Sequence, residues 1–380
     1  MTLVELTEAQ RTYQEECRAF VDREIVPRAE DYDADERFPD DLIAKMAARG
    51  FLSATAHEAS GCAGLDAIEY GLLCEELGRG CASARTLVTV HNMSVAAVLR
   101  WGGESLRDDW GRRLAAGQAV AAFALSEPDA GSDAASMSTT AVRRGDEYSL
   151  NGRKKWISFG QIADAFLLFA RLDDDVSAFL VARTAPGLEV HPIQQLSGCK
   201  ASMLAELRLT DCRVPSTHLV GRPGSGWRYV AATALDNGRY SVAWGCVGLA
   251  QACLDAALAY AARRLQFGQS LGSHQLVQRL LAEMITDVEA ARLLCEKAAR
   301  QRQRRDPAGV IATNVAKYFA STAASRVAAA AVHIHGANGF TRAFPVQRHW
   351  RDAKIMEVIE GSTEIQQLLI ARAALELVQP

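Results

Sequence analysis

The stretch TTAVRRGDEYSLNGRKKWIS, residues 139–158, decides the fold, because it places strands between two helical regions. It holds two hairpin-turn signals, Gly145-Asp146 and Asn151-Gly152, with residues of alternating character on either side. Short apolar runs flank it, namely AVAAFAL (119–125), FLLFARL (166–172) and SAFLVAR (177–183). The pattern predicts a small antiparallel β domain over residues 116–225.

The chain before this domain, residues 1–115, has helical periodicity. Spaced apolar positions predict a helix over Glu5–Ile25, and Asp40-Asp41 can cap a second helix that runs to about Arg49. Residues 57–66 read as a Gly-containing loop. Asp66, at its end, can cap the next helix.

The chain after this domain, residues 226–380, is alanine-rich and again helical. It predicts helices over Tyr240–Leu265, His274–Arg300 and Val310–Ile334, and a last helix after Gly361. That last helix has a capping-box pattern at Thr363-x-x-Gln366. Four helices with short connections predict a bundle. The fold class is therefore α+β, mainly α, with an N-terminal helical domain, a middle β domain and a C-terminal four-helix bundle.

Composition excludes several classes of protein. The 380 residues are 49% hydrophobic and 23% charged, with a net charge of −3, so nothing indicates a nucleic-acid partner. The longest uncharged stretches, among them Val327–Thr341, are shorter than the roughly 18 apolar residues of a membrane span. The N-terminus has no apolar signal core. The nine Cys form no C-x-x-C pair and read as reduced structural thiols, so we expect a cytoplasmic protein.

Common cofactor and metal motifs are missing. The sequence has no G-x-G-x-x-G and no P-loop, and none of the eight His follows a Glu by three residues. His333 and His335 would point to different faces of a helix, so we expect no metal site. A basic cluster, Arg300, Arg302, Arg304 and Arg305, either complements a helix dipole or forms a docking patch for an acidic partner.

Four motifs carry a resemblance over nearly the whole chain: LSEPDAGSDAASM (125–137), RRLQFGQSL (263–271), AVHIHGANGF (331–340) and RDAKIMEVIEGSTEIQ (351–366). In order and spacing they resemble the acyl-CoA dehydrogenase family. The resemblance implies an FAD-dependent dehydrogenase of an acyl thioester. It also implies a homodimer or homotetramer, with an acceptor such as electron-transfer flavoprotein.

The resemblance implies that Glu360 is the catalytic base. The chemistry needs a desolvated carboxylate of tuned pKa beside the thioester α-carbon, and Glu360 lies in a loop just before a capped helix. Part of the family carries its base before the arginine of an L-D-x-x-R segment, here Leu235–Arg239. Gly238 stands at that position and cannot be a base. Glu357 and Glu364 serve as controls that we expect to matter less.

Further binding residues are implied by the same motifs. The segments LSEP and WIS are expected to contact the flavin. The segments R-x-Q-F-G and A-V-H-I-H-G-A are expected to reach the FAD of a neighbouring subunit. The N-terminus of the last helix is expected to contact phosphate or adenosine. The cofactor residues are Phe123, Leu125, Ser126, Ser132, Trp156, Ile157, Ser158, Arg264, Gln266, Phe267, His333, Gly336, Ala337, Ser362, Thr363 and Glu364. The substrate residues are Ser132, Asp236, Arg239 and Gly361.

The chain departs from the family pattern at four positions. His333 replaces a usual Gln and Ala337 replaces a Gly, which weakens the expected adenine contacts. Phe159 stands where Asn is common, and Cys62 interrupts a Gly-Gly pair.

A narrower resemblance lies in SGCKA (197–201), GRYSVAWGCVG (238–248) and VIEGSTEI (358–365). These segments look like the subgroup that acts on acyl carrier protein thioesters in routes to hydroxymalonyl or methoxymalonyl polyketide extender units. They imply a three-carbon, glyceryl-derived hydroxyacyl thioester, oxidised at CH–CH or CH–OH. Two alternatives remain open: a catabolic short-chain acyl-CoA dehydrogenase that introduces an α,β double bond, and a non-catalytic flavoprotein or scaffold of the same fold.

Overall fold

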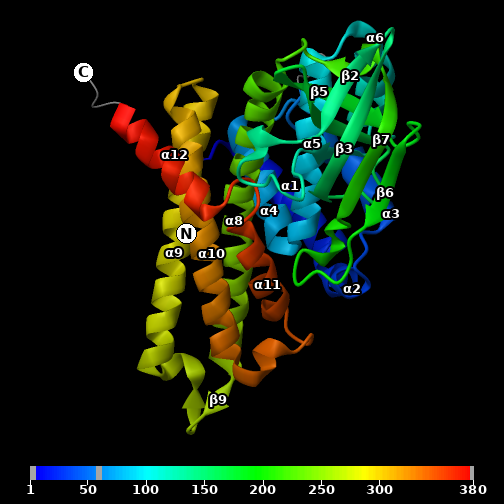
Figure 1. The fold of residues 1–380 in the computed structure, drawn as a ribbon. Helices are drawn as coiled ribbons and strands as arrows, with labels where there is room; N and C mark the ends of the chain where they lie inside the picture. The colour runs from blue at the N-terminus through cyan, green and yellow to red at the C-terminus, as the bar shows by residue number, and fades with distance from the viewer. Residues whose placement is uncertain (1–5, 57–61, 377–380) are drawn as a thin grey trace.

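The computed structural model describes residues 6–56 and 62–376. Long C-terminal helices stand side by side, and the N-terminal helices pack between them and a twisted β-sheet (Figure 1). The predicted order of helical, β and helical regions is confirmed. Glu5 and residues 57–61, which fall within the expected first helix and the expected loop, lie outside the described residues.

The N-terminal helices begin where local capping chemistry favours a start. Thr7 and Gln10 form a capping box before the first long helix, and Asp66 forms one with Glu69, as the Asp66 prediction requires. Asp40 and Asp41 are not caps: they lie in the first turn, where acidic groups favour the helix dipole, and Pro39 precedes them. The helical elements are α1 (Glu8–Glu24), η1 (Val26–Arg28), α2 (Ala29–Asp35), α3 (Asp40–Ala48), η2 (Phe51–Ser53), α4 (Ala67–Gly80), α5 (Ala82–Trp101), α6 (Glu104–Leu106), η4 (Arg107–Gly111) and α7 (Arg112–Ala115).

The middle region is one eight-stranded sheet with the order β6-β7-β3-β2-β4-β5-β8, and β1 pairs β4. The pairings β1–β4 and β2–β4 are parallel, so the sheet is mixed rather than purely antiparallel as predicted. Strands and short helices here are β1 (Ala121–Ala124), η5 (Ala134–Ser136), β2 (Thr140–Arg144), β3 (Glu147–Ile157), β4 (Ala165–Leu172), β5 (Asp175–Ala182), β6 (Leu188–Pro192), η6 (Lys200–Ser202), β7 (Ala205–Pro215), η7 (Ser216–His218) and β8 (Leu219–Val220).

Of the two predicted hairpin turns, one is confirmed. Gly145-Asp146 joins β2 to β3, and Arg144 pairs Glu147 across that turn. Asn151-Gly152 lies inside β3, at a shift in register against β7, so the prediction of a turn there was wrong. A side chain at Gly152 would run into Thr139, with a Cβ 2.7 Å from its Cα, so this glycine serves a bulge and not a reversal.

The C-terminal helices are longer than their apolar periodicity indicated. The first begins eight residues before Tyr240 and ends at Arg263, and an additional helix, α11, precedes the last one. The elements are η8 (Gly226–Ala231), α8 (Ala232–Arg263), β9 (Leu265–Gln266), β10 (Gln269–Ser270), η9 (Leu271–Ser273), α9 (Gln275–Gln303), α10 (Ala308–His335), η10 (Gly336–Phe340), α11 (Val346–Met356) and α12 (Thr363–Glu376).

Glycines allow α4 and α8 to cross in close contact. A Cβ at Gly78 would lie 2.6 Å from the Cα of Gly245, and a Cβ at Gly71 would lie 2.7 Å from Nε1 of the Trp244 indole. The close approach of α4 explains two of the three glycines in GRYSVAWGCVG, Gly245 and Gly248.

One helical stretch, Gly226–Arg263, is long and apolar enough by length and composition to cross a membrane. Two-thirds of its apolar window, 67%, is buried inside the protein, as expected for the central helix of a bundle.

Candidate functional site

Glu360 lies in a tight loop between α11 and α12. Glu360 and Gly361 both adopt left-handed backbone conformations, with φ of 55° and 88°. The Gln366 amide donates to the carbonyls of both residues, at 3.2 Å each, and the Lys317 ammonium of α10 donates to the Gly361 carbonyl at 2.6 Å. The loop is therefore held from two helices, and its strained conformation fixes the direction of the Glu360 side chain.

The Glu360 carboxylate lies directly against Gly238 of α8. A Cβ at Gly238 would be 2.6 Å from the carboxyl carbon of Glu360. The two positions at which the family places its base thus share one space, and here the glycine leaves room for the glutamate.

The electrostatics of this carboxylate suit a base. Glu360 Oε2 is buried and has no hydrogen-bond partner among the described residues. Burial raises the pKa of Glu360 above its ordinary value, although the cations Arg239, Arg85 and Lys317 each act to lower it. An ionised oxygen without a donor is a strong proton acceptor.

The segment before Gly238 lines a cavity of about 410 Å³. Arg302 forms an ion pair with Asp236, contacts the Asn237 side chain and stacks over the Tyr240 ring at 4.6 Å. Arg305 also lines this cavity. Arg302 therefore turns inward, whereas the basic cluster was interpreted only as a helix end or a docking patch. Arg239 points to the loop, where its Nε donates to the Glu360 carbonyl at 3.4 Å.

The start of α12 differs from its predicted cap. Thr363 is the first helical residue, and its hydroxyl donates to the Glu357 carbonyl at 3.4 Å. The Ser362 hydroxyl instead accepts from the Ile365 amide at 3.5 Å. The predicted capping box at Thr363 was therefore wrong by one position. The Gln366 side chain does not close such a box, because it donates to the carbonyls of the Glu360 loop. Glu364 is exposed beside this helix start.

The LSEP and WIS segments adjoin at one edge of the β-sheet. The Lys155 amide donates to the Ser126 carbonyl at 2.9 Å. Trp156 has a left-handed backbone, with φ of 65°, and its residue surface is 52% exposed. A bulky residue in this conformation on the surface is strained and is suited to stacking on a planar ligand.

The other expected flavin residues divide between core and surface. Leu125 and Ile157 are buried, so only their main chain can meet a ligand, as expected for LSEP. Ser126 and Ser158 are partly exposed and Ser132 is exposed. Phe123 packs on Phe169 with ring centroids 5.2 Å apart.

A buried ion pair supports this edge. Lys154 Nζ lies 2.8 Å from Glu127 Oε1, and both side chains are almost fully buried. Glu127 also accepts the amides of Ser138 and Thr139, at 2.7 and 3.0 Å, and Lys154 donates to the Leu125 carbonyl at 3.0 Å. Burial acts to raise the pKa of Glu127, but Lys154 and the neighbouring donors lower it to about 2.

A third group of expected cofactor residues lies at the far end of the bundle from the sheet (Figure 1). Arg264, Gln266 and Phe267 belong to the β9–β10 hairpin and are exposed, Phe267 at 95%. His333, Gly336 and Ala337 are exposed at the end of α10. Tyr260 joins the two segments, since it stacks on His335 at 4.2 Å and accepts from Asn338 at 2.8 Å. Within one chain, this group is not brought to the Trp156 edge.

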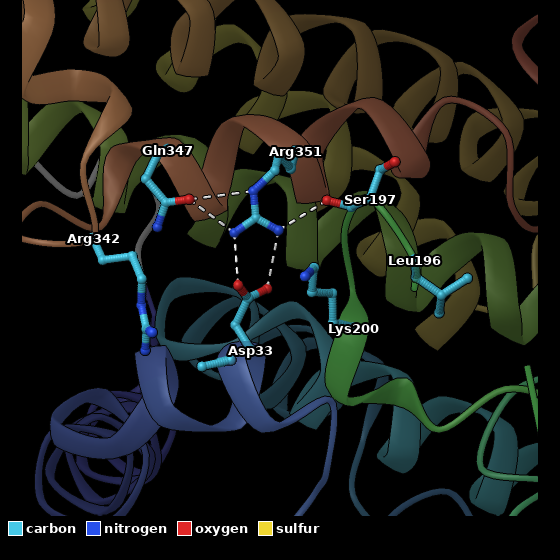
Figure 2. Close-up of a pocket in the computed structure, with 8 residues that line it drawn as sticks. Asp33, Leu196, Ser197, Lys200, Arg342, Gln347 and Arg351 are labelled. Carbon is cyan, nitrogen blue, oxygen red and sulfur yellow. Dashed lines mark hydrogen bonds and ion pairs between the residues drawn. The ribbon is translucent and has the colours of Figure 1, made fainter. Parts of the chain in front are cut away.

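A second cavity, of about 510 Å³, joins the three parts of the chain (Figure 2). Arg351 of α11 donates to both Asp33 carboxylate oxygens, at 3.1 and 2.7 Å, to the Ser197 carbonyl at 2.8 Å and to Gln347. The N–H donors of the Arg351 guanidinium are all bonded to protein groups. We therefore interpret this cavity as a structural junction between the three parts of the chain.

The structure adds residues that the sequence motifs did not single out. Arg85, Lys317, Glu127 and Lys154 are charged and buried. For Arg85 and Lys317 the available signal was an isolated charge within an apolar segment, since such groups are seldom buried without a specific partner, whereas Lys154 lies in a run of basic residues.

Cysteine and metal chemistry receive no support. All nine Cys lie within the described residues, are buried and form no disulfide. Burial raises the pKa of Cys246 to about 12. The described residues hold no group of three or more His, Cys, Asp or Glu side chains that could bind a metal ion.

Comparisons with known proteins match the whole architecture. Family models for the acyl-CoA dehydrogenase N-terminal, middle and C-terminal domains match residues 7–118, 122–212 and 224–375. The human mitochondrial short-chain specific acyl-CoA dehydrogenase is 38% identical over 374 residues, which cover 97% of this chain and 90% of that protein.

Two solved structures share the fold over nearly the whole chain. FkbI, for biosynthesis of the methoxymalonyl extender unit of the Fk520 polyketide, is 34% identical with a TM-score of 0.87, and the match covers 97% of this chain and 100% of that one. The prolyl acyl carrier protein oxidase AnaB is 27% identical with a TM-score of 0.92, over 97% and 100% of the two chains.

Proposed function

The chain belongs to the acyl-CoA dehydrogenase family, and from that premise we propose that it oxidises a short hydroxyacyl thioester carried on an acyl carrier protein, with Glu360 as the base. Members of this family are FAD-dependent oxidoreductases that act on acyl thioesters. The observation that carries the role of Glu360 is its buried, unpartnered Oε2, which lies beside the space left by Gly238.

The residues of the sheet edge fit a flavin. Trp156 presents an exposed ring from a strained backbone, and the partly exposed Ser126 and Ser158 supply hydroxyls beside it. We propose that these three residues hold the flavin ring, with the buried Glu127–Lys154 pair fixing their loops. Bound FAD would accept the hydride at its N5 atom.

The chain's own residues would handle the proton. Glu360 would take it onto Oε2, and the left-handed Glu360–Gly361 loop would keep the carboxylate aimed at the substrate. Arg239 and Lys317 hold the loop carbonyls and favour the ionised carboxylate before the proton transfer. Asp236 and Arg239 would line the entry of the carrier arm, because Asp236 lines the cavity that adjoins Gly238.

The basic cluster suits a docking partner with an acidic surface, such as a carrier protein. Arg302 is used internally, but Arg300, Arg304 and Arg305 are exposed and form no ion pair with any described residue. Of these three, Arg305 lines the cavity of Asp236, where an acidic carrier protein would present its thioester arm. The likeness to FkbI and AnaB supports the same reading. Nine buried thiols support the proposal of a cytoplasmic enzyme.

The second candidate is a short-chain acyl-CoA dehydrogenase, favoured by the 38% identity to the human enzyme of that name. Mixing the purified protein anaerobically with glyceryl carrier protein, glyceryl-CoA and butyryl-CoA separates the two. Loss of the oxidised flavin absorbance with glyceryl carrier protein alone supports the proposal. Rapid bleaching by butyryl-CoA supports the second candidate. A protein purified without flavin would contradict both.

The base is tested by Glu360→Gln. We expect this variant to keep its flavin and lose its reduction by substrate by a factor of about 10³ or more, since a properly placed base contributes roughly 10²–10⁴-fold and its loss also removes a charge. Glu357→Gln is the matched control and should keep most of the rate. Reduction of Glu360→Gln at a near wild-type rate would show that the base lies elsewhere.

A further inference from the structure

The guanidinium of Arg302, near the end of α9, connects three helices of the bundle. One Nη donates to the Asp236 carboxylate and the other to the side-chain oxygen of Asn237, both in the first turns of α8. The guanidinium also lies over the Tyr240 ring at 4.6 Å, and Nη1 is 3.4 Å from the Thr313 hydroxyl of α10. A single side chain therefore fixes the start of α8 relative to α9 and α10.

Arg302 also decides how Asp236 and Asn237 face the cavity of about 410 Å³ that all three residues line. Within the described residues, Arg302 is the only hydrogen-bond partner of either side chain. Asp236 Oδ1, the oxygen that Arg302 does not hold, is buried and unpartnered. Without Arg302 the carboxylate would lose its ion pair, and an unpaired carboxylate turns toward water, which here means toward the cavity.

The charges around this cavity are balanced, with one exception. Its lining holds the carboxylates of Asp66, Asp236 and Asp306 and the guanidiniums of Arg302 and Arg305. Asp66 and Asp306 accept backbone amides at the starts of α4 and α10, where the helix dipole offsets a negative charge. Arg302 offsets Asp236. Arg305 remains as a cation that forms no ion pair within the described part of the chain, so the cavity attracts an anion.

We propose that Arg302 is a positioning residue that allows this cavity to admit the phosphate group of a phosphopantetheine arm, with Arg305 as the cation that the phosphate meets. While Arg302 holds Asp236, the free charge of the cavity is positive. Once Arg302 is removed, the Asp236 carboxylate faces the same space and repels the phosphate. Carrier proteins and CoA share this phosphate ester. The inference rests on the proposed function, whose carrier arm passes Asp236.

The test presents one acyl group on four arms. Glyceryl thioesters of pantetheine, phosphopantetheine, CoA and acyl carrier protein are mixed anaerobically with FAD-loaded protein, and the half-saturating concentration for flavin reduction is measured for each. We expect Arg302→Gln to raise this concentration by about 10-fold or more for the three phosphate-bearing arms, and by less than about threefold for neutral pantetheine, at an unchanged limiting rate. The arm that wild type binds more tightly, carrier protein or CoA, identifies the source of the phosphate.

Asp236→Asn is the complementary variant, because it keeps Arg302 in place and removes the charge that Arg302 offsets. It should lower the ratio of the half-saturating concentrations of phosphopantetheine and pantetheine, whereas Arg302→Gln should raise that ratio. A contact with a structural role alone would not move the two ratios in opposite directions. Both shifts should shrink at high salt, because they are electrostatic. If Arg302→Gln does not hold flavin, Asp236→Asn decides.

Two further variants complete the set. Arg302→Lys should retain part of the wild-type ratio, because it keeps the charge and loses the forked geometry that holds two side chains. Lys297→Gln is the control for loss of a positive charge on α9, since Lys297 is exposed and lies outside the cavity lining. It should leave the ratio unchanged.

The inference alone would be overturned if Arg302→Gln raised the half-saturating concentrations of pantetheine and phosphopantetheine equally, or if Asp236→Asn shifted the ratio in the same direction as Arg302→Gln. Failure of all four wild-type mixtures to reduce the flavin would contradict the proposed function as well.

Discussion

At the scale of single residues, Gly238 and Glu360 form a matched pair. The carboxylate occupies the space that a side chain on α8 would take. We expect Gly238→Ala to displace the carboxylate and to lower the rate of flavin reduction by at least about 10-fold, because a misplacement of about 1 Å is costly in catalysis. Rapid-mixing measurement of flavin reduction checks this.

Gly268→Ala is not a suitable control for that change, because its backbone has φ of +78°. Gly103→Ala is suitable, since Gly103 has an extended φ of −62° and a Cβ there meets open space. It should reduce flavin at the wild-type rate. If Gly238→Ala reduced flavin at the same rate as Gly103→Ala, the contact between Gly238 and Glu360 would have no part in positioning the base.

The pH dependence of reduction follows from the same carboxylate. The base must be ionised, so the rate should rise with pH through the pKa of Glu360, which burial holds above the ordinary 4.5. Arg239, Arg85 and Lys317 lower that pKa, so removing one of these cations raises it further. Lys317→Met should therefore move the acid limb of the single-turnover pH profile to higher pH. A shift to lower pH would contradict the assignment of Glu360 as the titrating group.

At the scale of elements, the flavin edge depends on the ion pair beneath it. Glu127→Gln leaves the Lys154 charge buried without its partner, which typically costs about 3–5 kcal/mol of the free energy of unfolding. We expect a lower Tm and a loss of bound FAD, measured by calorimetry and by the flavin-to-protein absorbance ratio.

The matched control is Glu189→Gln on the exposed edge strand β6, where the Glu189 carboxylate forms an ion pair with His191 at the surface. Exposed pairs of this kind contribute about 0–1 kcal/mol, so this variant should keep its Tm and its flavin. The double variant Glu127→Gln/Lys154→Met should regain part of the lost stability because it removes the unpaired charge. Equal Tm values for Glu127→Gln and Glu189→Gln would show that the buried pair does not hold this edge.

Elements also show what sequence patterns can and cannot predict. The Gly145-Asp146 turn and the Asp66 cap were predictable, because each depends on residues next to each other in the chain. Asn151-Gly152 has the same local signal but lies within β3, because β7 and Thr139 impose the bulge. The start of α8 was missed, since a helix buried on several sides lacks the apolar stripe that marks an amphipathic one.

In the candidate site, too, sequence patterns could predict only features that depend on residues close together in the chain. Glu360 and Trp156 were found through motifs, but the contact of Glu360 with Gly238 joins positions that are distant in sequence. Arg85 is separated from Met356 by 271 residues, so no local pattern could place them together.

At the scale of the whole molecule, the expected cofactor residues fall into groups at opposite ends of the chain's fold. The β9–β10 hairpin, with its almost fully exposed Phe267, stands away from β3, the strand that holds Trp156 (Figure 1). A cofactor that uses both groups needs a second subunit, which would also cover Phe267 and remove its apolar ring from water. We therefore expect a homodimer at least, with Arg264 of one chain contacting the FAD of the other.

Arg264→Ala tests this arrangement because it couples two measurements that are independent in a monomer. If Arg264 donates to FAD phosphate across an interface, its loss should lower the flavin content and shift the assembly toward smaller species together. Light scattering after size exclusion gives the mass, and the absorbance ratio gives the flavin. Arg263→Ala is the matched control, since the Arg263 side chain is exposed and, within the described part of the chain, bonds only to the Ala259 carbonyl of its own helix. Added FAD should restore the mass of Arg264→Ala by mass action, because the ligand binds only the assembled form. Full flavin content in Arg264→Ala, or a monomeric wild type with full flavin content, would place the whole cofactor site within one chain.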